Sequence, residues 1–335
     1  MPVLRPWALI VSGVAAAALA ACGGASAPPK DAGPLPEARV LPPIDVGGAP
    51  SAIAIGAGSV WVADQARGRV LRIDPRSRRR AGRAVRIGGG PLALAVGEGG
   101  VWVADGDGNV RSIDPRTGTV RPGGVRVVGA NGLAVGAGGV WVTSRIAGTL
   151  TRIDPVTRRP GRPIRVGAGA ADVVVANGAV WVANSADGTI SRVDPATGRA
   201  AAAVPSGASG VLALAADDGG LWVARAGGRF GDQVSIVRLD TEERRVTGKA
   251  VAVEGAVPLD LAAGSGSVWA TDAGSVLPLG APRPAAVTRI DARNAARTGG
   301  PLRVGRRPSA VAVGAGGLWV ADAVDGTVTP VRVGS

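Results

Sequence analysis

The sequence has no histidine and no tyrosine, and only one phenylalanine and one cysteine among its 335 residues. Without histidine there can be no Ser-His-Asp triad and no histidine-ligated zinc or haem. A single cysteine allows neither an intrachain disulfide nor a CxxC redox pair. These absences exclude several common enzyme classes before any pattern is considered.

Acidic residues are also few: the chain has 25 Asp and Glu and 38 Lys and Arg, which gives a net charge of +13. Hydrophobic residues make up 46%, so the chain can form a core, and its length suits one large domain or two ordinary ones. The 54 glycines and 25 prolines are typical of a fold with many tight turns.

The N-terminus is interpreted as an export signal over residues 1–21, with Arg5 followed by an apolar stretch from Trp7 to Ala21. Leu19-Ala20-Ala21-Cys22 resembles a bacterial lipobox, so we expect lipidation of Cys22 and anchoring at the extracytoplasmic side of the cell membrane. An ordinary secretory signal is the alternative. Residues 22–38 are rich in Gly, Ala, Ser and Pro, which predicts a tether.

Seven of the eight tryptophans recur at intervals of 41, 39, 40, 41, 47 and 50 residues: Trp61, Trp102, Trp141, Trp181, Trp222, Trp269 and Trp319. A period near 40 with several short strands per unit is typical of a propeller blade. Each unit has an apolar run, a Val-Trp-Val-like strand, a third strand ending in Ile/Val-Asp-Pro, and a short fourth strand. We predict an all-β, seven-bladed propeller over residues 39–335, with four-stranded antiparallel blades.

Two expectations about packing and closure follow. Small and bulky residues alternate on the innermost strands, so the tryptophans are expected in the core between blades. The seventh unit lacks a fourth strand after Thr327–Val333, and Val40–Val46 precedes the first inner strand. We therefore expect Val40–Val46 to complete the last blade and close the ring.

The seven Trp units and the Ile-Asp-Pro turns resemble bacterial β-propellers of the YVTN, NHL and virginiamycin B lyase-like superfamily, over Val40–Ser335. The resemblance implies the fold. It implies no activity, because the lyase depends on histidine and no position aligns with the Glu-Asn-Asp cation set of the lactonase-type propellers.

In such a blade the loops between the second and third strands, and the links between blades, lie at one end, here called the top. The residue three positions after each Trp falls there. Four of these residues could form a Ca²⁺ or Mg²⁺ site without histidine: Asp64, Asp105, Asn184 and Asp322. Asp172 and Asp260, just before inner strands, are expected near the same mouth.

The fifth and sixth units carry longer loops at the top, between Trp222 and Asp240 and between Trp269 and Asp291. Adjacent insertions on otherwise regular blades favour a binding site there, although loop drift without function is equally open. The residues assigned to this binding site are Arg225, Arg229, Phe230, Asp232, Asp272 and Leu277. No catalytic residue is assigned.

Many arginines fall on the third-to-fourth turns and outer strands, and are expected on the outer rim and at the opposite end of the propeller, here called the bottom. The tether is expected to emerge at this end too, so we expect the bottom to face anionic membrane lipids. Codon bias of a GC-rich genome is the alternative source of the arginine excess. The basic residues in question are Arg76, Arg78, Arg79, Arg80, Arg83, Arg86, Arg116, Arg121, Arg126, Arg158, Arg159, Arg162, Arg199, Arg244 and Arg245.

The preferred function is a monomeric, membrane-tethered binding or scaffold module, without a required cofactor, that holds a protein or envelope polymer at its top loops. The alternative is a cation-dependent lyase or hydrolase that uses the Asp/Asn rim. Binding of nucleic acid by the arginines is a third possibility. Export and the absence of clustered aromatics argue against it.

Overall fold

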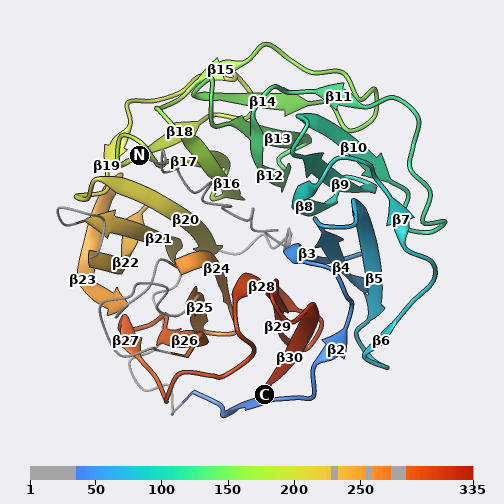
Figure 1. The fold of residues 1–335 in the computed structure, drawn as a ribbon. Helices are drawn as coiled ribbons and strands as arrows, with labels where there is room; N and C mark the ends of the chain where they lie inside the picture. Colours follow the sequence, from blue (N-terminus) through green and yellow to red (C-terminus); the bar gives the residue numbers. More distant parts are fainter. Residues whose placement is uncertain (1–34, 228–232, 254–257, 273–283, 335) are drawn as a thin grey trace, which may run out of the picture.

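The computed structural model describes residues 35–227, 233–253, 258–272 and 284–334. These residues form seven antiparallel sheets arranged as blades around a central axis (Figure 1). The predicted seven-bladed, all-β architecture is confirmed. No helix in the described part of the chain is long and apolar enough to cross a membrane.

Each blade begins with an inner strand near the axis, followed by a second strand that carries the repeated tryptophan. The inner strands are β3 (Pro50–Gly56), β8 (Pro91–Gly97), β12 (Ala130–Gly136), β16 (Ala170–Ala176), β20 (Gly210–Asp217), β24 (Pro258–Gly264) and β28 (Pro308–Gly314). The second strands are β4 (Ser59–Asp64), β9 (Gly100–Asp105), β13 (Gly139–Ser144), β17 (Ala179–Asn184), β21 (Gly220–Gly227), β25 (Ser267–Asp272) and β29 (Gly317–Asp322).

The third and fourth strands complete the blades. The third strands are β5 (Arg69–Asp74), β10 (Asn109–Ile113), β14 (Thr149–Ile153), β18 (Thr189–Val193), β22 (Gln233–Asp240), β26 (Ala286–Asp291) and β30 (Thr327–Val333). The outer pieces are β6 (Arg79–Arg80), β7 (Val85–Arg86), β11 (Val125–Arg126), β15 (Ile164–Arg165), β19 (Val204–Pro205), β23 (Arg245–Val253) and β27 (Ala296–Arg297). Most outer pieces are two residues long, so the fourth strands are weaker than the sequence pattern predicts.

The N-terminal segment closes the ring, as predicted. β1 (Ala38–Val40) and β2 (Ile44–Asp45) both pair with β30, with Val40 opposite Val331 and Ile44 opposite Val328. Figure 1 shows the blue N-terminal strand beside the red β30. The predicted single strand Val40–Val46 is split because Pro42 and Pro43 cannot donate backbone hydrogen bonds. β1 also begins at Ala38, one residue before the predicted start of the propeller.

The core lies between neighbouring blades. Trp61, for example, packs in one cluster with Leu94, Val101 and Val103 of the next blade. All seven repeated tryptophans are at most 3% exposed, as expected for core residues. Burial of large aromatic side chains contributes several kcal/mol at each position. This repeated packing holds each blade at a fixed angle, so the strand ends form two well-defined faces.

Candidate functional site

The residues three positions after the tryptophans lie at the top, where they end the second strand in every blade but the fifth. Asp64, Asp105, Asn184 and Asp322 are fully buried. Burial of four polar side chains at equivalent places requires that each be hydrogen-bonded. The structure shows how that requirement is met.

Asp64 and Asp322 each connect two segments of backbone. Asp64 Oδ1 accepts hydrogen bonds from the N–H of Ala49 in the preceding link (3.1 Å) and of Arg67 in the following loop (3.2 Å). Asp322 accepts the N–H of Arg307 in its link (2.8 Å) and those of two residues in its loop. Each carboxylate therefore ties the entry of a blade to the turn between its second and third strands.

Asn184 plays the same role in the fourth blade. Its Oδ1 accepts the N–H of Gly167 in the link (3.1 Å), and its Nδ2 donates to the hydroxyls of Thr189 and Ser191. In the second blade, Asp105 Oδ1 accepts the backbone N–H groups of Asp107 (3.1 Å) and Asn109 (2.8 Å). These side chains stabilise the loops.

Two blades reverse the direction of this bond. Ser144 Oγ donates to the Val128 carbonyl in the preceding link, at 2.7 Å. Arg225 Nη1 donates to the Ser206 carbonyl, and its Nε donates to Ser235 Oγ at 3.1 Å. Partial burial lowers the pKa of the Arg225 guanidinium. In five blades, the residue three positions after the tryptophan therefore bonds to the backbone of the incoming link, through whichever polar group that blade supplies.

These bonds bear on the predicted cation site. Within residues 35–227, 233–253, 258–272 and 284–334, no group of three or more His, Cys, Asp or Glu side chains is placed to hold a metal. The structure therefore does not bring Asp64, Asp105 and Asp322 together as one ligand set. Binding of Ca²⁺ or Mg²⁺ by these residues and Asn184 stays a prediction, and it would require each to exchange backbone N–H donors for the ion.

The predicted ligand-binding residues are only partly described. Arg225 on β21 and Asp272 on β25 lie at the top ends of adjacent blades, where the two inserted loops begin. Both side chains are partly exposed. Arg229, Phe230, Asp232 and Leu277 lie outside the described residues, so this site also stays a prediction.

Asp172 and Asp260 were predicted to lie just before the inner strands, and this placement is wrong. They lie within β16 and β24, where both are buried. Asp172 Oδ2 accepts the N–H of Leu214 in β20 (2.7 Å), and Asp260 Oδ2 accepts that of Val311 in β28 (2.9 Å). Each carboxylate therefore joins its inner strand to that of the next blade. Burial, assisted by the negative charge of Asp172, raises the pKa of Asp260 well above its ordinary value.

The bottom face has a different character. The aspartates that end the third strands make Asx turns, as in Asp154, whose Oδ1 accepts the N–H groups of Val156 and Thr157. Those backbone bonds lower the pKa of Asp154, and similar bonds lower the pKa of Asp74, Asp114 and Asp194. These carboxylates therefore stabilise the Ile/Val-Asp-Pro turns.

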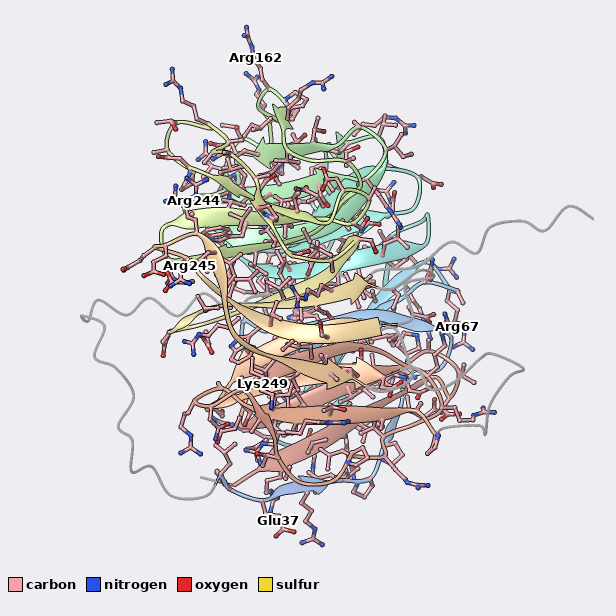
Figure 2. The ribbon with its side chains drawn as sticks, turned by 90° about the vertical axis from the view of Figure 1, so that its left-hand side faces the viewer. Glu37, Arg67, Arg162, Arg244, Arg245 and Lys249 are labelled. Atoms are coloured by element: carbon pink, nitrogen blue, oxygen red, sulfur yellow. The ribbon has the colours of Figure 1, made fainter. Side chains whose placement is uncertain are left out.

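Most of the arginines predicted for the bottom and outer rim are exposed. Two of them do not lie at the bottom: Arg86 and Arg126 stand opposite Arg69 and Asn109, the first residues of β5 and β10, and therefore lie at the top end of the outer rim. In the part of the chain that the structure describes, Arg121 pairs with Asp114 and Arg245 with Glu243, whereas Arg76, Arg78 and Arg79 make no ion pair. Figure 2 shows the propeller edge-on, with Arg244 and Arg245 on one side and Arg67 on the other, and with Arg162 projecting from the rim.

The sequence pattern also contains a set of residues that was not among the predicted site residues. The residue two positions before the third-strand Asp is an arginine in five blades, and its guanidinium lies over the tryptophan ring of the same blade, 4.9–5.9 Å from the ring centroid. The signal is the repeated triplet Arg-Ile/Val/Leu-Asp. The arginines are Arg72, Arg152, Arg192, Arg238 and Arg289.

No protein-family model and no curated protein sequence matches this chain. Solved structures do resemble it. A streptogramin B lyase matches with a TM-score of 0.67 and 17% identity, over 89% of this chain and 97% of the other. Virginiamycin B lyase from Staphylococcus aureus gives 0.70 and 15%, over 89% and 100%. Hydrazine synthase from Kuenenia stuttgartiensis gives 0.72 and 14%, over 85% and 96%. At such identities the likeness shows a shared seven-bladed fold alone.

Proposed function

We propose that this protein is a membrane-tethered binding module, anchored through lipidated Cys22, whose bottom face rests on anionic lipid headgroups. Its top loops after β21 and β25 then project away from the membrane and hold a protein or an envelope polymer. The proposal assigns no catalytic step to the chain.

The observation that carries the proposal is the place where the chain enters the propeller. Ala38, the first residue of β1, lies opposite Val333 at the end of β30. That end of the third strand is the bottom, where the third-to-fourth turns of the other blades carry Arg76, Arg79 and Arg158. A lipid at Cys22 and these arginines therefore act on the same face.

The charges at that face support the same orientation. A basic residue near an anionic surface contributes up to about 1 kcal/mol of binding, and several such residues add up. Exposed arginines without an acidic neighbour can contribute most, because no local carboxylate competes for them. Two lipid chains at Cys22 would supply stable anchoring, and the arginines would set the orientation.

The proposed membrane orientation is tested by measuring how the full chain carrying Cys22→Ser binds to vesicles with and without phosphatidylglycerol. We expect binding that requires the anionic lipid and weakens as salt is raised. Binding that is indifferent to both would contradict the proposed orientation.

The proposed binding of a partner by the top loops is tested by crosslinking in intact cells. The parent chain is compared with one whose segments 228–232 and 273–283 are shortened. The matched control is Arg79→Ala/Arg80→Ala on the bottom face. A crosslinked partner that is lost on shortening the loops and kept in the control supports the proposal. A partner that persists without the loops contradicts it.

A further inference from the structure

Three arginines surround a cavity at the top end of the first blade's outer rim. The cavity has a volume of about 340 Å³ and is lined by Arg67, Arg69, Ala84 and Arg86. Arg67 lies in the loop between β4 and β5, Arg69 begins β5, and Arg86 ends β7. Arg67 and Arg86 are exposed and Arg69 is partly exposed. Three separate segments therefore supply guanidinium groups that solvent can reach.

The strand register brings two of these cations together. Arg69 on β5 stands directly opposite Arg86 on β7. Directly opposed residues of an antiparallel pair project from the same face of the sheet, and like charges in such a pair are destabilising. The third cation lies at the adjoining link, because Arg69 Nη2 donates to the Val46 carbonyl (3.2 Å) and the Arg67 guanidinium lies against Gly47. An anion among these groups would offset their mutual repulsion.

One buried carboxylate faces the three cations. Arg69 Nε donates to Asp64 Oδ2 at 2.8 Å, and Arg67 Nη1 lies 3.9 Å from the same oxygen. No ion pair of Arg86 occurs among the residues that the structure describes. Arg69 uses two of its five N–H groups, toward Asp64 and the Val46 carbonyl, so three remain for a ligand. The cavity thus keeps an excess of positive charge and of donors.

The seventh blade shows that the fold does not need these arginines. Its Asp322 is the counterpart of Asp64 and is equally buried. Asp322 accepts the backbone N–H groups of Arg307, Val324 and Asp325, and it pairs with no arginine side chain in the described part of the chain. A buried aspartate at this position is therefore satisfied by backbone alone.

The equivalent positions of other blades are mostly acidic or neutral. At the place of Arg67, the second, third, fourth and seventh blades have an acidic or small residue, and at the place of Arg69 they have an amide or hydroxyl residue. In that order, the counterparts are Asp107, Ala147, Asp187 and Asp325 for Arg67, Asn109, Thr149, Thr189 and Thr327 for Arg69, and Arg126, Arg165, Pro205 and Asp45 for Arg86. Among these five blades, only the first combines three arginines.

We propose that this cavity binds the phosphate ester of a small polyol. Guanidinium groups from three segments can each contact a different oxygen of a tetrahedral phosphate, whereas one guanidinium fork already fills both oxygens of a carboxylate. The volume lies at the lower end of the range of about 300–1,000 Å³ for ligand pockets, so it suits a group of the size of glycerol phosphate.

The phosphate ester comes either from a free organic phosphate or from the repeating unit of an anionic envelope polymer. The site itself depends neither on the membrane orientation nor on the loops after β21 and β25. Only the polymer source rests on the proposed export of the protein.

The direct test is calorimetric titration of the full chain carrying Cys22→Ser with glycerol 3-phosphate. We expect saturable binding that weakens as salt is raised. Glycerate, which has a carboxylate in place of the phosphate ester, should bind at least about tenfold more weakly. Absence of saturable binding, or equal binding of glycerate, would overturn the proposal.

Two substitutions remove arginines of the cavity without touching the core. Arg86→Ala shortens an exposed side chain, and Arg69→Thr introduces the residue that the third, fourth and seventh blades carry there. Each should weaken binding at least about tenfold, because charge-assisted hydrogen bonds to phosphate are lost. Arg126→Ala is the matched control, because Arg126 is the counterpart of Arg86 opposite Asn109, and binding should stay within about twofold. An equal loss in the control, or binding that survives both Arg86→Ala and Arg69→Thr, would refute the site.

A poly(glycerol phosphate) chain distinguishes the two sources. Binding that is tighter per phosphate unit than that of glycerol 3-phosphate, and that is lost in Arg69→Thr, assigns the site to a polymer. Binding no tighter than that of the monomer assigns it to a free organic phosphate.

Vesicles keep this site separate from the membrane orientation. With the bottom face on the membrane, lipid headgroups do not reach the cavity, so Arg67→Ala should weaken binding of glycerol 3-phosphate and leave vesicle binding almost unchanged. Failure of either measurement therefore leaves the other to stand. An equal loss of vesicle binding would show that lipid headgroups occupy the cavity, and would overturn both assigned sources.

Discussion

On the top face, Asp64, Asn184 and Asp322 are fully buried and accept hydrogen bonds from the backbone of the links between blades. On the bottom face, Arg76, Arg79 and Arg332 are exposed and make no ion pair within the described residues. These polar side chains at the top of this propeller thus spend their hydrogen bonds on the fold. The arginines at the bottom keep theirs available to solvent or a ligand. The hydrogen bonds that a side chain already makes indicate its availability for a ligand better than its place in the fold does.

The largest effect is expected at the top. Asp322→Ala leaves the N–H groups of Arg307, Val324 and Asp325 without their acceptor, so the free energy of unfolding should fall by about 2–3 kcal/mol. The matched bottom variant, Arg79→Ala, should leave it almost unchanged. Denaturant unfolding of both variants measures the contrast. Equal losses would show that the two faces are not used differently.

Vesicle binding compares the two faces through their arginines. Arg79→Ala/Arg80→Ala should weaken binding to phosphatidylglycerol vesicles by up to about 30-fold, at up to about 1 kcal/mol per arginine. Arg67→Ala, an exposed arginine at the top, should change it little. Cosedimentation at low salt measures both. A larger loss of vesicle binding in Arg67→Ala would place the membrane against the top face and contradict the account.

Two classes of aspartate should respond oppositely to pH. The pKa of Asp260 is raised, chiefly by burial, so its contribution to stability is present below its unfolded pKa and is lost as pH rises through the folded pKa. The pKa of Asp154 is lowered by the N–H of Thr157, so its contribution is present above the unfolded value and is lost as pH falls through the folded value.

The check is the difference in unfolding free energy between the parent and a non-titrating variant across pH. Relative to Asp260→Asn, the parent should lose stability from about pH 4 upward; relative to Asp154→Asn, it should lose stability below about pH 4. The same sign of slope for both pairs would contradict the assigned causes.

The smallest effect is expected from divalent cations. Because Asp105 and Asp322 already accept backbone N–H groups, millimolar Ca²⁺ or Mg²⁺ should shift the melting temperature by less than about 1 °C. A larger shift that disappears in Asp105→Ala or Asp272→Ala would restore the cation site and the enzymatic alternative.

Much of the fold could be predicted because its causes are periodic. The tryptophan spacing gave the blade count, and the missing fourth strand after Val333 identified the closing segment. The split of that segment at Pro42 and Pro43 was also readable from the sequence. The short length of the outer strands, such as Val125–Arg126, could not be predicted from the sequence. It depends on how many residues after each turn can pair with the third strand.

The site was harder to predict because the sequence places a residue on a face without giving its bonds. Asp64 and Asp322 fall at the mouth, but only the structure shows that link backbone occupies their oxygens. Asp172 and Asp260 were expected outside the inner strands and lie within them. The break at Pro330 in the Arg-Ile/Val/Leu-Asp triplet was visible in the sequence. Only the structure shows that the arginines of five other blades lie over their tryptophan rings.

Hydrogen–deuterium exchange of the full chain carrying Cys22→Ser, with and without phosphatidylglycerol vesicles, tests the bottom-down orientation most directly. The account predicts slowed exchange in the turns that contain Arg76, Arg79 and Arg158, and unchanged exchange in the loops that follow Asp64, Asn184 and Asp322. Protection of those loops, with the arginine turns unaffected, would contradict it.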